Sequence, residues 1–226
     1  MTQTGTAAAG LDDLLLAAGI DLAADLGDGP VRFECLRAAQ RIQRALASPG
    51  PGGGPRVGGA SLGLLPASAN VGVVGVGVHL ALALAELSGS PVGYVDANLR
   101  WPALAPPAPV RDDSGEQSFG GSAFFTRWLR GDVAVLVPHR KSLAGAGATA
   151  LPRLLASARE LFACCLVDLT GWQRLGEHLQ AFDLLDGVVL VAHAGRSTEE
   201  ELLRLDAEIP PHKHLGVLLL GADPPG

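Results

Sequence analysis

Six short, almost uninterrupted apolar runs recur along the chain, and helix-like segments separate them. The runs occupy residues 60–66, 92–96, 133–137, 163–168, 187–192 and 215–220. Strands that are apolar along their whole length have both faces covered, which is typical of parallel sheets. The alternation with helices therefore predicts a doubly wound α/β fold, in which helices pack on both faces of a mostly parallel sheet.

Helix-like segments fill the gaps between these runs. They occupy residues 74–87, 122–130, 149–162, 174–184 and 197–207, and two further helices are expected at 10–26 and 31–47. Within 122–130, an apolar set at helical spacing is expected to face the core, namely Phe124, Phe125, Trp128 and Leu129. The last helix begins with a capping box, read here as Ser197, Thr198, Glu199 and Glu200.

Changes in composition divide the chain into three parts. Residues 48–55 read SPGPGGGP, which is typical of a flexible linker or loop. We therefore expect an N-terminal helical segment at 1–47, a glycine- and proline-rich linker or loop at 48–59, and an α/β domain at 60–226.

The uncharged stretch 57–85 is long enough to span a bilayer. Pro66, Asn70 and His79 interrupt it, however, and no basic flank anchors it on both sides. A buried strand, a glycine-rich loop and a buried helix explain the same stretch. Because residues 1–10 also lack the features of a secretory signal, we expect a cytoplasmic protein.

Charge and cysteine content exclude several classes of partner and ligand. The chain has 17 Lys and Arg against 23 Asp and Glu, a net charge of −6, and no basic run, so we expect neither a nucleic-acid partner nor a polybasic membrane patch. Cys35, Cys164 and Cys165 form no CxxC motif and are expected to be buried, reduced thiols. No spacing of His, Cys and carboxylates resembles a zinc site, so we expect no metal.

Ligands of doubly wound domains bind beyond the carboxyl ends of the strands. At those places the sequence reads ASANVGVV (67–74), VDANLRWP (95–102) and CLVDLTG (165–171). In this order, these segments resemble the deviant-Walker P-loop ATPases. That group includes partition and Min-type ATPases and, more closely, the cytosolic bacterial tyrosine kinases of capsule and exopolysaccharide export. The resemblance implies a P-loop NTPase-like domain with a nucleotide site at these strand ends.

Individual residues match the motifs of those kinases only in part. Asp96, Asn98 and Arg100 stand in an Asp-x-Asp-x-Arg motif, and Asp168 ends the next strand of the site, where the family holds Mg²⁺ and orients its nucleophile. Upstream, the helix at 31–47 resembles the N-terminal helix of the family at Phe33, Leu36 and Arg37.

The phosphate loop lacks its two most important side chains. Aligning 67–74 with GxxxxGK[ST] keeps Gly72, but Val73 replaces the lysine and Val74 replaces the hydroxyl residue that holds Mg²⁺. A rival register at 72–79 places Val78 and His79 at those positions, and His79 is more simply a hydrogen-bonded core histidine. Both registers lose the cation and the hydroxyl.

The missing lysine has a predictable cost. Its charge-assisted contacts contribute about 1.5–3 kcal/mol each, and about 1.4 kcal/mol is tenfold in affinity. Asp96 and Asp168 would face a triphosphate with no counter-charge and repel it. We therefore predict no catalytic residue, weak or absent binding of ATP and Mg²⁺, and a vestigial nucleotide site made of Gly72, Val73, Val74, Asp96, Asn98 and Asp168.

A pseudo-ATPase that works as an adaptor or scaffold explains these features best. The resemblance implies a homodimer that docks on a protein, such as the cytosolic segment of a membrane protein, in envelope polysaccharide export or polar positioning. Arg37, Arg100 and Trp101 are the candidate contacts with a partner. The chain has one tyrosine, Tyr94, in a predicted strand, so we expect no autophosphorylation of a tyrosine-rich tail.

Two other functions stay open. An active ATPase or kinase would need a lysine from elsewhere, and Lys141 is the candidate. An NAD(P)-binding Rossmann protein would use Gly75 and Gly77 at the phosphate turn and Asp96 for the ribose.

Overall fold

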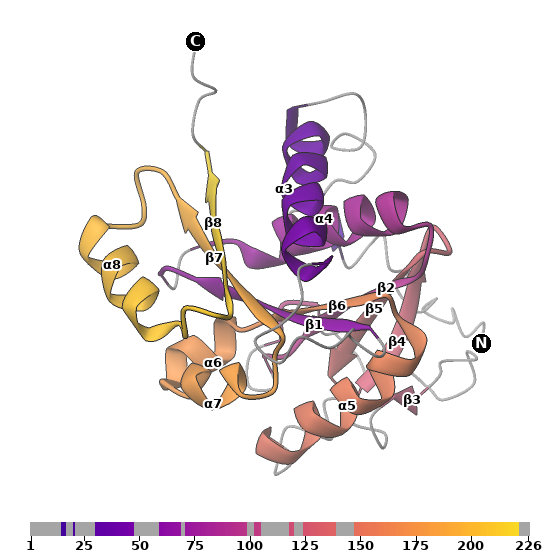
Figure 1. Cartoon of the computed structure of the whole chain (residues 1–226). Helices are drawn as coiled ribbons and strands as arrows, with labels where there is room; N and C mark the ends of the chain where they lie inside the picture. Colours follow the sequence, from indigo (N-terminus) through magenta and orange to yellow (C-terminus); the bar gives the residue numbers. More distant parts are fainter. Residues whose placement is uncertain are drawn as a thin grey trace, which may run out of the picture.

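The computed structural model describes residues 15–16, 20, 30–47, 59–68, 71–98, 102–104, 118–119, 124–138 and 147–221. Its strands form one eight-stranded sheet in the order β3-β4-β5-β2-β6-β1-β7-β8 (Figure 1). The strands are β1 (Ala60–Pro66), β2 (Val92–Asp96), β3 (Ser118–Phe119), β4 (Phe124–Leu129), β5 (Val133–Pro138), β6 (Cys164–Asp168), β7 (Gly187–His193) and β8 (His214–Leu220). From β5 to β8 in the sheet all neighbours are parallel, whereas β4 is antiparallel to both β5 and β3.

Helices cover both faces of this sheet. The helices are α3 (Pro30–Ala47), α4 (Val73–Ser88), α5 (Gly147–Leu161), α6 (Thr170–Leu175), α7 (His178–Phe182) and α8 (Glu199–Glu208). Residues of α3 and α4 share one buried cluster with Leu62 and Leu64 of β1. Residues of α5 to α8 share a second cluster with Leu65 of the same strand. The alternation along β1 thus separates two cores, which confirms the predicted doubly wound α/β fold.

The helix that follows β1 is the best-predicted element. It was expected at 74–87 and spans Val73–Ser88, because alanine and leucine favour the helix and Gly89 ends it. Gly89 has a φ of 61° and donates its backbone N–H to the carbonyl oxygen of Ala85. Across the described parts of the chain, no helix has both the length and the apolar character needed to cross a membrane.

The helix expected at 122–130 is wrong, because β4 occupies Phe124–Leu129 and pairs with β5 as a hairpin. The turn between the two strands contains Arg130 (φ 53°) and Gly131 (φ 85°), two positive values that fit the right-handed twist of a hairpin. Aromatic residues favour strands, and a short apolar run has no decisive period. Phe124, Phe125 and Leu129 are buried as expected, but Trp128 is 48% exposed.

Smaller differences concern the C-terminal helices. The helix expected at 174–184 is divided into α6 and α7 at Gly176, whose φ of 69° ends α6. The capping box begins one residue later than expected, with Thr198 as N-cap and Glu201 as its partner. Most of the helix expected at 10–26 lies outside the described residues.

The segment before the linker contributes to the same interior as the sheet. Cys35, Ala39 and Ile42 of α3 are buried in the cluster that contains Leu62. All three cysteines are buried and none forms a disulfide. Burial raises the pKa of Cys35 to about 11 and the pKa of Cys165 to about 12, so these thiols stay protonated and unreactive.

Candidate functional site

Two aspartates meet at the carboxyl ends of neighbouring central strands. Asp96 ends β2 and Asp168 ends β6, and the two residues are direct partners in the parallel register. Asp168 is also the register partner of Leu64 in β1, the strand that leads into α4. Asp96 is 0% exposed and Asp168 is 2% exposed. The structure therefore brings together the two carboxylates that the sequence placed at strand ends.

Both carboxylate oxygens of Asp96 accept backbone hydrogen bonds. The N–H of Asn98 donates to Oδ1 over 3.1 Å, and the N–H of Leu104 donates to Oδ2 over 3.1 Å. These bonds tie the chain that follows β2 back to the end of the strand. Asp96 therefore holds the local backbone, as well as facing the second carboxylate.

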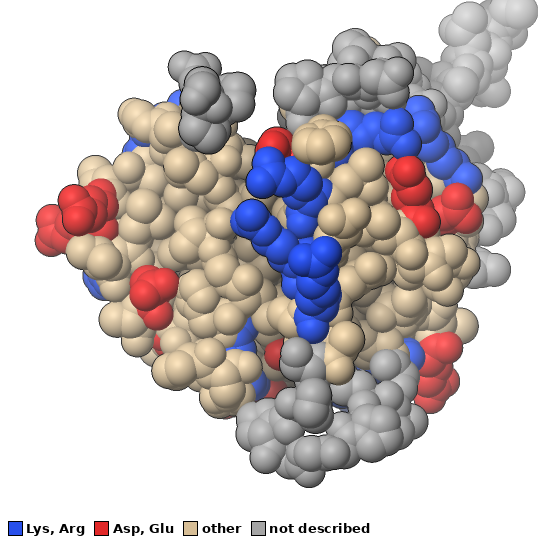
Figure 2. Space-filling model, turned by 45° about the horizontal axis from the view of Figure 1, so that its top comes forward, with Lys and Arg blue, Asp and Glu red and all other residues tan. Residues whose placement is uncertain are grey.

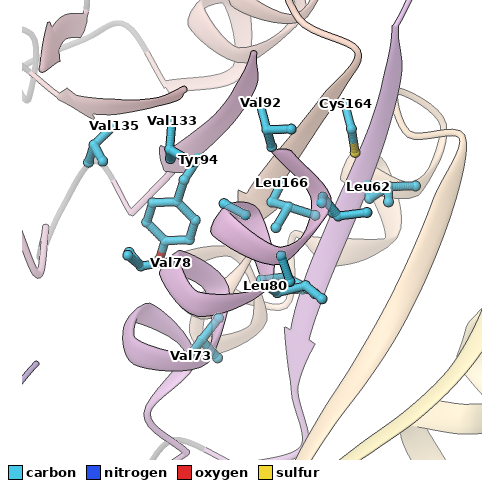
Figure 3. Close-up of a cluster of buried hydrophobic side chains, with 14 of the residues drawn as sticks. Leu62, Val73, Val78, Leu80, Val92, Tyr94, Val133, Val135, Cys164 and Leu166 are labelled. Atoms are coloured by element: carbon cyan, nitrogen blue, oxygen red, sulfur yellow. The ribbon is translucent and has the colours of Figure 1, made fainter. Parts of the chain in front are cut away.

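Both oxygens of Asp168 are occupied as well. The backbone N–H of Thr170, at the start of α6, donates to Oδ1 over 2.8 Å. The phenolic hydroxyl of Tyr94 donates to Oδ2 over 3.2 Å. Tyr94 is 0% exposed, and Figure 3 shows it pointing from its strand into the buried cluster that includes Val73 and Val78 of α4. All four oxygens of the two carboxylates thus accept hydrogen bonds from the protein itself.

Burial shifts the ionisation of all three groups. Burial and the charge of Asp168 raise the pKa of Asp96 to about 7, although backbone donors oppose the shift. Burial also raises the pKa of Asp168, and burial followed by the two aspartates raises the pKa of Tyr94 well above its usual range. Among the described residues, neither carboxylate forms an ion pair with Lys or Arg. The pair therefore takes up a proton near neutral pH.

The start of α4 favours the alignment of residues 67–74, rather than 72–79, with the phosphate-loop motif. Gly72 is the N-cap and Val73 the first helical residue, so 72–79 is helix rather than loop. Val73 is 2% exposed in the core, and Val74 packs partly against it. The residues aligned with the lysine and the hydroxyl are therefore apolar, one buried and one partly buried. Ser68, within the stretch 67–74 that was aligned with the phosphate loop, is also buried.

The rival register and the Rossmann turn both place residues of this helix in a loop. Gly75 and Gly77 lie within α4, as does Val78, which is 0% exposed. His79 is 6% exposed, and its Nδ1 lies 2.8 Å from the carbonyl oxygen of Gly75. It is the hydrogen-bonded core histidine that the sequence favoured.

Three residues that support the site were missed by sequence reasoning. Tyr94 lies two residues before Asp96 and so shares its face of the sheet, which is the signal that could have identified it. The indole N–H of Trp172 donates to the carbonyl oxygen of Ala97 over 3.3 Å. Gly171 leaves room for Asn98, since a Cβ there would lie 2.5 Å from Oδ1 of Asn98. The buried Asn98 therefore belongs to the packing around the two aspartates.

Of the three candidate partner contacts, only Arg37 lies among the described residues. Arg37 lies on α3 with its side chain 52% exposed and forms an ion pair with Glu34 at 2.9 Å. Arg100, Trp101 and Lys141 lie outside the described residues. Within the ranges that the structure describes, no group of three or more His, Cys, Asp or Glu side chains is placed to hold a metal ion.

No protein-family model and no curated protein matches this sequence. Solved structures do match. The BceF tyrosine kinase domain is similar with a TM-score of 0.55 and 17% identity, over 85% of this chain and 75% of that chain. The VpsO kinase domain is similar with a TM-score of 0.54 and 17% identity, over 84% of this chain and 97% of that chain. This chain has the fold of a bacterial tyrosine kinase domain.

A further match extends over nearly the whole of both chains. The chimerical protein CapA2B2 is similar with a TM-score of 0.65 and 14% identity, over 94% of this chain and 99% of that chain. The kinase-domain fold, predicted from the ordered strand-end motifs, is therefore confirmed, and it is P-loop NTPase-like.

Proposed function

We propose that this protein is a catalytically inactive P-loop ATPase-like adaptor or scaffold that works through contacts with other proteins. One observation supports this proposal above all. The four oxygens of Asp96 and Asp168 accept hydrogen bonds from Asn98, Leu104, Thr170 and Tyr94, and the helix beside them begins with two valines. The carboxylates thus have a structural role within the protein.

The described residues do not fit a Mg²⁺-nucleotide. In a P-loop, a lysine contacts the β- and γ-phosphates and a Ser or Thr hydroxyl binds Mg²⁺. Val73 and Val74 can supply neither group, and both are packed against the core. The N-terminus of α4 still offers backbone N–H groups to an anion. Those groups alone do not neutralise the charge that phosphoryl transfer develops.

The negative charge of the pair also disfavours a nucleotide. Here the pKa of Asp96 is raised to about 7 by burial and by Asp168. A triphosphate entering this site would add negative charge next to two buried carboxylates.

The proposed partners follow from the resemblance to the tyrosine kinases of polysaccharide export. They are a second copy of the chain and a protein segment, such as the cytosolic part of a membrane protein that recruits this protein from the cytoplasm. Envelope polysaccharide export or polar positioning is the proposed process. The kinase-domain fold supports this proposal because the fold is kept although Val73 and Val74 stand at the positions of the phosphate-loop lysine and hydroxyl residue.

Isothermal titration calorimetry with Mg-ATP tests the proposal. We expect no binding heat at micromolar concentrations, and no nucleotide absorbance at 260 nm after the purified protein is denatured. Micromolar binding accompanied by phosphate release would contradict the proposal. If that release were lost in Lys141→Ala, it would establish the active ATPase instead. An NADH titration followed by tryptophan fluorescence covers the remaining alternative.

A further inference from the structure

The outer face of α3 gathers basic and aromatic side chains. Phe33 is 64% exposed, the side chain of Arg37 is 52% exposed, and Arg41 and Arg44 are exposed too. We call these four residues the arginine ridge. Figure 2 shows a band of Lys and Arg side chains across the face of the molecule on which α3 lies.

Helical spacing explains why the ridge forms. Cys35, Ala39 and Ile42 recur every three to four residues and are buried, so they define the inner face of α3. At 100° per residue, Phe33, Arg37, Arg41 and Arg44 fall together on the opposite face. The arginines are never adjacent in sequence, so a search for a basic run does not find them.

The charge of α3 is opposite to that of the chain. The helix carries four arginines and one glutamate, in a protein whose net charge is −6. Arg32 binds Glu86 of α4 at 2.9 Å, which helps to fix α3 on the domain. Arg37 pairs with Glu34 on the same exposed surface, where ion pairs are weak and exchange readily with other carboxylates.

We propose that the arginine ridge docks a short acidic segment of a partner protein. Carboxylates of the segment bind Arg37, Arg41 and Arg44, and an apolar side chain covers Phe33. Arginine and aromatic residues together are the side chains that most often dominate binding energy in protein interfaces. The inference rests on the proposed adaptor function and names the chemistry of the partner.

Size and charge favour a peptide over an extended anionic surface. From residue 33 to residue 44 the helix rises about 16 Å, which an extended peptide of about five residues covers. A short segment feels mainly the local positive charge of α3. An anionic bilayer or a nucleic acid would cover more of the protein surface and so bring more of its acidic side chains within a Debye length of about 8 Å, where repulsion is still felt. A short acidic segment is therefore the ligand that the ridge can bind while the rest of the surface repels anions.

Fluorescence anisotropy with the full chain tests this inference. The probe is a fluorescein-labelled peptide of alternating glutamate and leucine, and its control is the same peptide with glutamine for glutamate. We expect saturable binding of the glutamate peptide alone, lost at high salt. The double variant Arg37→Gln/Arg41→Gln and the variant Phe33→Ala should each weaken binding, the double variant about tenfold or more.

The matched control removes two arginines from the opposite side of the sheet. Arg153 of α5 and Arg204 of α8 are exposed, and Arg204 pairs with Glu208 as Arg37 pairs with Glu34. Arg153→Gln/Arg204→Gln should leave binding unchanged. Circular dichroism of each variant shows whether it is folded.

Three outcomes would overturn the inference. They are absence of binding by the glutamate peptide, equal loss in both double variants, and co-flotation with phosphatidylserine vesicles that is stronger than binding to the peptide. Failure here leaves the inactive nucleotide site untouched, since calorimetry with Mg-ATP tests that site separately. Conversely, ATP turnover would refute the proposed function and leave the peptide-binding result standing.

Discussion

The hydroxyl of Tyr94 donates a hydrogen bond to Oδ2 of Asp168 over 3.2 Å, inside a layer of the protein where both side chains are buried. A carboxylate in that position needs donors, because burying an unpaired charge is costly. Tyr94 supplies one of them from the neighbouring strand, and the backbone of Thr170 supplies the other. Both carboxylate oxygens of Asp168 thus accept hydrogen bonds from the protein itself, and the following predictions test that arrangement.

Replacing Tyr94 with Phe keeps the ring and removes only the donor. We expect Tyr94→Phe to lower the free energy of unfolding by about 1–3 kcal/mol, because one oxygen of a buried carboxylate loses its partner. Urea denaturation followed by circular dichroism measures the change.

A double-mutant cycle supplies the control for this prediction. In an Asp168→Asn background the hydrogen bond no longer involves a charge, so the same tyrosine substitution should cost less. An equal cost in both backgrounds would show that the hydroxyl stabilises the fold through something other than Asp168.

The ring of Tyr94 also limits how α4 packs on the sheet. A Cβ at Gly77 would lie 2.3 Å from Cε2 of Tyr94 and 3.0 Å from Cδ1 of Leu64, and both residues are completely buried. We expect Gly77→Ala to reduce the free energy of unfolding by about 1–3 kcal/mol, because the helix must move away from the strands.

Gly75 in the same helix is the matched control. Its nearest neighbour would be Cγ1 of Ile20 at 3.7 Å from a new Cβ, which is an ordinary contact. Gly75→Ala should therefore stabilise the protein by about 0.5–1 kcal/mol through the helix preference of alanine. Thermal denaturation of both variants should give shifts of opposite sign, and shifts of the same sign would contradict the close packing at Gly77.

The parallel core of this fold was predictable because its signals are local. Continuous apolar runs rich in valine, such as Val133–Pro138, favour buried strands, and the long alanine- and leucine-rich run before Gly89 favours a helix. That Asp96 and Asp168 lie at the same edge of the sheet also followed, because the carboxyl ends of parallel strands meet at one edge, whereas their direct pairing depends on the strand order that the structure shows.

Features that depend on three-dimensional contacts were not predictable in this way. The hydrogen bond from Tyr94 and the fit of Gly171 against Asn98 join residues more than 70 positions apart. The hairpin after Phe124 was missed because its turn, Arg130–Gly131, has none of the usual asparagine or aspartate residues before glycine. Of the arginine ridge, the sequence identified Arg37 as a partner contact but not Arg41 or Arg44, because these residues are dispersed in sequence and gather only on a helix.

The hairpin turn gives a prediction of its own. Arg130 has a φ of 53°, a conformation that costs a residue with a side chain about 1–2 kcal/mol and costs glycine very little. Arg130→Gly should therefore be neutral or stabilising by up to about 1 kcal/mol. Gly131→Ala should be destabilising by about 1 kcal/mol, because the φ of 85° at Gly131 strains a residue with a side chain. No neighbouring atom would obstruct the new Cβ, so this backbone strain is the whole effect. If 122–130 were helical, Arg130→Gly would be destabilising instead, and chemical denaturation distinguishes the two.

The aspartate pair makes stability fall as pH rises. In the folded protein the pKa of Asp96 is raised to about 7, from an ordinary value of 3.8, by burial and by Asp168. Between about pH 4 and pH 7 the folded state therefore binds more protons than the unfolded state, and the free energy of unfolding decreases as pH increases. The shift corresponds to a loss of up to about 4 kcal/mol, which is complete above pH 7.

Urea midpoints measured from pH 5 to pH 8 check this slope. In Asp168→Asn the neighbouring charge is gone, so the pKa of Asp96 falls and the decline should end at a lower pH. In Asp96→Asn the contribution of Asp96 itself should disappear, leaving the smaller slope due to Asp168, whose pKa is also raised by burial. Equal slopes in the wild type and in Asp96→Asn from pH 5 to pH 7 would show that Asp96 is already ionised at pH 5, and would contradict this prediction.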